Sequence, residues 1–162
     1  MRVIKDNSIV EDDWQLIEVE GENAKIPEGS VIVPYGYWKM NKQQLLNRGL
    51  ALGVCVKGDD IIEEVAEDIE HFQLIALDFP NFKDGRSYSH ARMLRERYNY
   101  KGELRAVGEV LRDQLFFLRR CGFDSFQLSP DKDFEDALKG FSDFTVTYQT
   151  AADGAVPVYK NR

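Results

Sequence analysis

Two carboxylates follow apolar segments of the chain and are the residues best placed for acid–base chemistry. Asp78 comes directly after the apolar segment 74–77, and Glu109 follows the expected strand 104–107, separated from it by Gly108. If both segments are strands of one parallel sheet, the two carboxylates lie at the same edge, where open α/β sheets bind their ligands. Asp78 and Glu109 are therefore the candidate catalytic residues, one as general acid and the other as general base.

Polar residues on the loops after the expected strands are candidates for binding a ligand or a partner. Guanidinium groups beside carboxylates at one edge of a sheet suit a polar or anionic ligand. The alternative is that these loop residues cap helices and pair with one another. The loop candidates are Asp84, Gly85, Arg86, Arg112 and Asp113, and the other strand ends add Lys57, Asp59 and Ser129.

Arginine is dense between residues 86 and 120, and Arg92 and Arg95 join the candidates for partner binding. Arginine rather than lysine favours fixed, bidentate partners such as carboxylates or phosphate-like anions. The alternative is a solvated helix face on which Arg92 pairs with Glu96 one turn later. A second expected helix carries the opposite charge, so the two helices would give the surface a dipole that orients an incoming protein. Its acidic residues are Glu63, Glu64, Glu67 and Asp68.

The cysteines and histidines indicate neither a metal site nor a redox centre. Cys55 and Cys121 are far apart in apolar surroundings, so both are expected in the core. His71 and His90 are not spaced as metal ligands, either with each other or with the cysteines. The sequence also lacks a glycine-rich dinucleotide loop, a phosphate-binding P-loop and the cysteine spacing of an iron–sulfur cluster. It therefore points to no metal and no evident cofactor.

Composition and charge restrict the class of protein. Residues 1–162 are enough for a single domain with a substantial core. A net charge of -7 disfavours binding to nucleic acid or an anionic membrane, because the field of the protein repels polyanions. No segment has the ~20 apolar residues of a membrane span, and the first residues lack the apolar core of a signal peptide. We expect a cytoplasmic protein, and its oligomeric state stays open.

Strand and helix patterns alternate along most of the chain. Residues 1–30 are typical of an N-terminal antiparallel β-ribbon, residues 31–149 of a β/α repeat core, and residues 150–162 of a tail. One helix should begin after Asn41 as its N-cap and stop at Gly49, and a late one should be capped by Asp131 or Asp133. The strands expected in the core are residues 31–33, 50–56, 74–77, 104–107, 125–128 and 144–148.

This alternation predicts an α/β fold. Strands joined by short helices form a mostly parallel sheet, here of about six strands, by right-handed crossovers. The chain is too short for the eight β/α units of a complete barrel. We favour an open sheet, and a partial β/α barrel is the structural alternative.

A long stretch of the chain resembles a known bacterial family. The matching motifs are LIALDFPNFKDGRSYSHARMLRERYNYKGELRAVGEV, then LRDQLFFLRRCGFDSF, and the N-terminal VEDDW also fits. These residues are similar to the family catalogued as domain of unknown function 934. Its members are described as lying beside genes for the sulfite reductase haemoprotein and for the reduction of activated sulfate, and some are labelled oxidoreductases. The resemblance implies a role in assimilatory sulfate or sulfite reduction, and no catalytic residues are assigned to the family.

Three functions remain in view. The first, which we favour, is an accessory or electron-transfer protein that binds sulfite reductase or its electron donor. The second is a small oxidoreductase-type enzyme that uses Asp78 and Glu109 on a polar anionic ligand held by Arg86 or Arg112. The third is a flavin or nucleotide binder with an unrecognised loop. The first predicts co-purification with the reductase, and the second predicts that a carboxylate with a perturbed pKa lies in a pocket.

Overall fold

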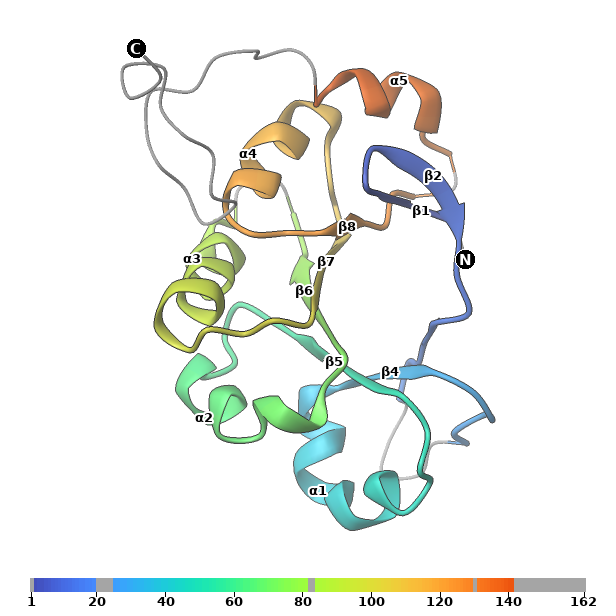
Figure 1. Cartoon of the computed structure of the whole chain (residues 1–162), viewed down its shortest axis with the longest axis vertical. Coiled ribbons are helices and arrows are strands. Elements are labelled where there is room, and N and C mark those ends of the chain that lie inside the picture. The colour runs from blue at the N-terminus through green and yellow to red at the C-terminus, as the bar shows by residue number, and fades with distance from the viewer. Residues whose placement is uncertain (1, 20–24, 82–83, 130, 142–162) are drawn as a thin grey trace.

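The computed structural model describes residues 2–19, 25–81, 84–129 and 131–141, and these form one mixed α/β fold around an eight-stranded sheet (Figure 1). The strand order across the sheet is β2-β1-β8-β7-β6-β5-β4-β3. The strands are β1 (Arg2–Lys5), β2 (Ser8–Glu11), β3 (Gln15–Leu16), β4 (Val31–Pro34), β5 (Leu52–Val56), β6 (Leu74–Phe79), β7 (Glu103–Gly108) and β8 (Ser125–Phe126).

Helices alternate with the later strands and cover the outside of the sheet (Figure 1). The α-helices are α1 (Tyr35–Leu46), α2 (Ile62–Glu67), α3 (Arg86–Arg92), α4 (Leu115–Arg120) and α5 (Phe134–Lys139). Shorter turns extend three of these segments: η1 (Ile69–His71), the π-helical η2 (Met93–Arg97) and η3 (Arg112–Gln114).

The prediction of a mostly parallel α/β sheet is confirmed. Strands β3 to β8 pair in parallel along the order of the sheet, and β1 pairs antiparallel with both β2 and β8. The N-terminal hairpin is therefore part of the same sheet. The segment around Gln15–Leu16 was expected to belong to the ribbon, but it lies at the opposite edge, parallel to β4. The strand expected at 144–148 and the tail at 150–162 lie outside the described residues.

The sheet curls into a partial barrel, the alternative to the open sheet that we favoured from the sequence. Its two edge strands, β2 and β3, are consecutive in the chain and are joined only by residues 12–14. Such a connection spans at most about 14 Å, so the two edges cannot be far apart. Figure 1 shows this N-terminal chain running between the two ends of the curved sheet. We call residues 12–14 the strap.

The curled sheet has a core on each face. The outer face packs against the helices in the larger cluster, which includes Val54, Ile75 and Leu77. The inner face carries a smaller cluster built from Ile32, Leu74, Ala76 and Val107, and Trp14 and Leu16 pack against it. Because both faces are covered, the middle strands read as nearly continuous apolar runs.

A buried ion cluster ties the strap to the inner face. Arg105 on β7 is 0% exposed, and its NH2 group contacts carboxylate oxygens of Asp12 and, at 3.0 Å, Glu103. Its Nε donates to Ser125 Oγ at 3.1 Å. Lys5 Nζ lies 3.1 Å from the second oxygen of Glu103. The fully buried charge of Arg105 is thus neutralised by the partly exposed carboxylates of Asp12 and Glu103, as a buried charge requires.

One helix start differs from the prediction, and two other helix-end predictions agree with the structure. Helix α1 begins at Tyr35 rather than after Asn41, because the chain turns into a helix as soon as β4 ends. Asn41 lies at a kink inside α1, where its side-chain amide donates to the Tyr37 carbonyl at 3.0 Å. Gly49 has a positive φ of 65°, as expected for a residue that ends a helix. Asp133 caps α5 by accepting from the Asp136 N–H at 3.1 Å.

Candidate functional site

An open cavity of about 1120 Å³ lies at the mouth of the partial barrel where the parallel strands end. Each of β3 to β8 contributes to its wall at or just beyond its carboxyl-terminal end. This is the edge at which parallel β/α proteins hold their ligands. The polar side chains in the described part of the wall are Glu18, Tyr37, Asn41, Cys55, Lys57, Asp78, Gln127 and Ser129.

Lys57 and Asp78 lie side by side in this wall. Val56 at the end of β5 pairs with Leu77 on β6, so the next residue on each strand, Lys57 and Asp78, are neighbours. Asp78 is half-buried, and burial raises its pKa above the ordinary value. The Lys57 ammonium acts against this rise, and the Asp84 carboxylate adds to it. The site therefore holds a carboxyl group whose pKa is raised by burial and a cation beside it.

Two residues fix the position of Asp78. Ser87, in the first turn of α3, is 1% exposed, and its hydroxyl donates to the Asp78 carbonyl at 2.8 Å. This hydrogen bond ties α3 to the end of β6. On the other side, a Cβ at Gly108 would lie only 2.7 Å from Asp78 Oδ1 and would also collide with the Phe79 carbonyl. Gly108 has a φ of 89°, which favours glycine.

Further polar groups of the wall include an amide, a hydroxyl and a thiol. Gln127 Oε1 is shielded from solvent and has no hydrogen-bond partner within the described part of the chain. Ser129 follows two residues later and lines the same cavity. Cys55 points to the inner face, where burial raises the pKa of its thiol to about 12. Such a thiol is almost entirely protonated at neutral pH, which excludes it as a thiolate nucleophile.

Of the two candidate catalytic carboxylates, only Asp78 lines the cavity. Glu109 lies at the same end of the sheet, since β6 and β7 are parallel and its N–H donates to the Phe79 carbonyl at 2.7 Å. Its side chain is exposed, and it is not among the described residues of the cavity wall. The parallel register therefore brings both residues to one rim, with Asp78 inside the cavity and Glu109 outside.

The candidates Asp84, Gly85 and Arg86 form a compact loop beside the rim. The guanidinium of Arg86 makes two hydrogen bonds to the Asp84 carboxylate, at 2.8 and 3.1 Å, and lowers the pKa of Asp84 to about 2. Gly85 precedes α3 at its N-cap position. Arg86 also lies over Gly58, where a Cβ would come within 2.7 Å of its Nε. This pairing matches the alternative in which the loop residues bind one another.

The other arginine candidates lie at three separate places. Arg92 contacts Glu96 at 3.4 Å, which confirms the pairing expected one helical turn apart. Arg112 contacts both its neighbour Asp113, at 3.8 Å, and Asp136 on α5, at 3.3 Å. The Asp113 side chain is 91% exposed. None of these described side chains lines the cavity that contains Asp78.

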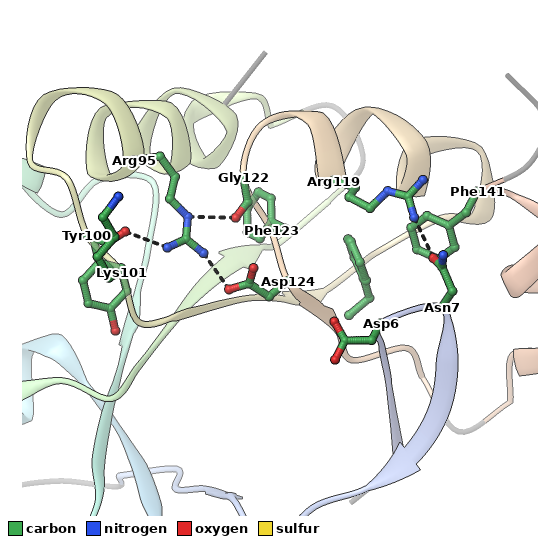
Figure 2. Close-up of a pocket in the computed structure, with 11 residues that line it drawn as sticks. Asp6, Asn7, Arg95, Tyr100, Lys101, Arg119, Gly122, Phe123, Asp124 and Phe141 are labelled. Carbon is green, nitrogen blue, oxygen red and sulfur yellow. Dashed lines mark hydrogen bonds and ion pairs between the residues drawn. The ribbon is translucent and has the colours of Figure 1, made fainter. Parts of the chain in front are cut away.

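Arg95 lies at the opposite mouth of the barrel, in a second cavity of about 630 Å³ (Figure 2). Its guanidinium donates to the carbonyls of Tyr100, Gly102 and Gly122 at 2.7 to 3.0 Å. It also contacts the Asp124 carboxylate at 2.6 Å. Figure 2 shows the bonds to Tyr100, Gly122 and Asp124 converging on Arg95. The geometry is that of a residue which joins the loops before β7 and β8.

The described residues contain no group of three or more histidines, cysteines or carboxylates placed to hold a metal ion. Within the same residues, no helix has the length and apolar character to cross a membrane. The described wall of the cavity carries two carboxyl groups, Asp78 and Glu18, one cation, Lys57, and uncharged hydrogen-bonding groups among apolar side chains.

Sequence reasoning identified Lys57, Asp78 and Ser129 at this edge but missed Gln127. The signal for Gln127 lies in the alternation along β8, where Ser125 and Gln127 face inward and Phe126 faces the helices. The prediction treated the whole segment 125–128 as a strand and did not separate its two sides.

Comparison with known proteins gives one match. A family model described as "Bacterial protein of unknown function (DUF934)" matches residues 53–159. A search of curated proteins finds no match. The matched segment begins inside β5 and includes β6 to β8, so it carries Asp78, Gln127 and the buried Arg105.

Proposed function

Since the chain belongs to the DUF934 family of bacterial proteins of unknown function, we propose a function from the site itself. The protein binds a small molecule at the carboxyl-terminal mouth of the barrel, holds a carbonyl or anionic oxygen of it with Lys57, and moves a proton through Asp78. This is the enzyme-type alternative considered from the sequence, with Lys57 in the role first given to Arg86 or Arg112.

The observation that carries this proposal is the pairing of Lys57 and Asp78 in one cavity wall. A carboxyl group in a cleft with a pKa raised by burial and a specific charged neighbour is a candidate functional group. The hydrogen bond from Ser87 to the Asp78 carbonyl and the close packing of Gly108 against Asp78 Oδ1 support the same role, because proton transfer needs a fixed geometry.

The chemistry that fits is proton transfer next to an oxygen. The Asp78 carboxylate accepts a proton from a C–H or O–H group adjacent to the bound oxygen. Negative charge then develops on that oxygen, where the Lys57 ammonium stabilises it. In the reverse direction the protonated Asp78 returns the proton. The raised pKa of Asp78 brings it closer to the pH at which a carboxyl group serves both steps.

Ligand-observed NMR with a mixture of small carbonyl and carboxylate compounds tests the proposal. We expect binding to the native chain, weaker binding to Lys57→Met, and a change in its pH dependence in Asp78→Asn. The matched controls are Lys132→Met and Glu135→Gln, which change exposed residues at the start of and within α5. If the two site variants bind the mixture as the native chain does, Lys57 and Asp78 do not form the site.

The resemblance motivates a second candidate, an accessory or electron-transfer role in cytoplasmic sulfite reduction. The specific observation that favours it is an acidic surface on α2, on which Glu63, Glu64 and Glu67 are all exposed. Ile61 precedes this helix with 54% of its surface exposed. Exposed acidic residues around an apolar side chain suit a basic protein partner, whose approach the charges would steer.

Co-purification with the sulfite reductase haemoprotein or its electron donor tests this second role. The triple variant Glu63→Lys, Glu64→Lys and Glu67→Lys should abolish the association, and reversing exposed charges elsewhere on α5, at Glu135 and Asp136, should leave it intact. An association that survives the α2 changes would show that this surface is not the docking site. Unchanged reductase activity and donor affinity with and without the protein would remove the role itself.

A further inference from the structure

A row of inward-facing residues crosses four adjacent strands at the mouth of the barrel. Asp78 on β6 pairs with Val107 on β7. The β7–β8 register pairs Ala106 with Phe126, so the next residues, Val107 and Gln127, are also opposite each other. Lys57 adjoins Asp78 on the other side. The row therefore reads Lys57, Asp78, Val107 and Gln127, and all four line the cavity.

The spacing of strands gives this row a length. Neighbouring strands lie about 4.8 Å apart, so two steps separate Asp78 from Gln127 by roughly 10 Å. The polar groups thus lie toward both ends of the row, with the apolar Val107 between them. The rest of the described lining combines apolar side chains, among them Leu16, Val19 and Met40, with polar ones, Glu18, Tyr37 and Asn41.

The side-chain carbonyl of Gln127, at the other end of the row, lacks a hydrogen-bond donor within the described part of the chain. Its Oε1 is shielded from solvent and receives no hydrogen bond within the described part of the chain. A buried acceptor without a donor is unfavourable, and native proteins pair such groups with protein, water or ligand. A ligand that brings an N–H or O–H group to Gln127 would satisfy it.

We propose that the ligand of this cavity is an elongated, mostly apolar molecule with a carbonyl-type oxygen at the Lys57 end and a hydrogen-bond donor at the Gln127 end. Gln127 is then a specificity residue that recognises the donor. This inference rests on the proposed function for the Lys57 end and adds the second end and the distance between them.

A matched pair of fluorescent probes tests the donor position. In 6-hydroxy-2-acetonaphthone a ketone and a hydroxyl group stand at opposite ends of a rigid apolar body, and 6-methoxy-2-acetonaphthone replaces the donor hydroxyl by a methoxy group. We expect the native chain to bind the hydroxy probe about tenfold more tightly, the effect of one buried hydrogen bond. In Gln127→Met this preference should vanish, and Gln127→Glu, which keeps an acceptor, should restore part of it.

The outcomes separate the two proposals. Equal binding of both probes to the native chain, with weaker binding to Lys57→Met, overturns the role of Gln127 and leaves the Lys57 end intact. A preference that persists in Gln127→Met also overturns it. If neither probe binds, the ligand class proposed here is wrong, and the NMR mixture then decides the proposed function separately. Thermal unfolding of each variant shows whether it is folded, and the ratio of the two affinities is independent of the fraction of active protein.

Discussion

Replacing Arg105 by methionine is the most informative test of how the barrel is held closed. The side chain is 0% exposed and contacts Asp12, Glu103 and Ser125 at once. Methionine retains much of the apolar length but no charge. The change therefore removes the ion pair between Asp12 and β7. Glu103 also loses its ion pair with Arg105 but keeps the one with Lys5.

The expected cost follows from the burial of the cluster. Removing one partner of a buried ion pair destabilises a protein by about 3–5 kcal/mol, because the remaining charge stays desolvated. Since a domain of this size has a stability of about 5–15 kcal/mol, the variant should be folded but much less stable. By contrast, Arg92→Met removes an exposed pair with Glu96, and such a pair is worth about 0.3–0.5 kcal/mol.

Urea unfolding at neutral pH, followed by circular dichroism, measures both variants. We expect Arg105→Met to lose about 3–5 kcal/mol and Arg92→Met to lose less than about 1 kcal/mol. In a double-mutant cycle, Asp12→Asn should cost less in the Arg105→Met background than alone, because the shared interaction is already gone. A loss below about 1 kcal/mol in Arg105→Met would refute the view that this cluster closes the barrel.

The same cluster sets an acid limit on stability. Burial alone would raise the pKa of Glu103, but hydrogen bonds from Ser125 and Arg105 and the charge of Arg105 outweigh it, so the pKa lies below the ordinary 4.5. A carboxylate with a lowered pKa contributes stability above its unfolded pKa and loses it as pH falls through the folded value. Arg105→Met should therefore show a smaller loss of stability than the native chain as pH falls below 4.5.

Three further substitutions have expected outcomes in the same urea assay. Asp78→Asn should raise the free energy of unfolding at neutral pH, because the raised folded pKa of Asp78 means that its charged form destabilises the native chain. No gain should remain below the ordinary pKa of aspartate, where Asp78 is protonated in both the folded and the unfolded state. Gly108→Ala should cost more than about 1 kcal/mol, since it combines a positive φ with a collision against Phe79; a neutral result would show that the turn can relax. Arg95→Met should cost at least about 3 kcal/mol, because it leaves three carbonyls without their donor, and a smaller loss would mean that water replaces the guanidinium.

The sequence could predict which strands are parallel and where their polar ends gather. Apolar runs separated by capped helices imply right-handed crossovers, and these place every strand end at one mouth. Asp78 was therefore identifiable, because it ends the run 74–77 with a charged group. The same logic placed Glu109 at this edge but could not show that its side chain turns outward on the tight bend after Gly108.

The curl of the sheet could not be predicted in the same way. Strand β3 has only two residues, and its alternation does not reveal whether it pairs with the hairpin or with β4. The deciding interaction is the contact of Asp12 with Arg105, 93 residues away in the chain. A charged residue in an apolar strand usually indicates an exposed edge, and an inward Arg105 is possible because carboxylates of the strap and of β7 neutralise it.

The density of arginine was a weak guide for a related reason. Arg95 and Arg105 lie in the matched family segment, yet one joins loops at the opposite mouth and the other lies inside the barrel. Both satisfy the expectation that arginine seeks fixed, multidentate partners. Those partners are carbonyls and carboxylates of the same chain, which composition alone cannot distinguish from the groups of another protein.

The strap also couples the stability of the barrel to the shape of the site. Residues 12–14 lead directly into β3, and the residues from Leu16 to Val19 form part of the cavity wall. Holding Asp12 on Arg105 and Trp14 on the inner apolar cluster therefore fixes the start of that wall. In Arg105→Met, the affinity for 6-hydroxy-2-acetonaphthone should fall even under conditions where the variant is fully folded, whereas Arg92→Met should bind as the native chain does. Unchanged affinity in folded Arg105→Met would mean that the wall is held by β3 and β4 alone.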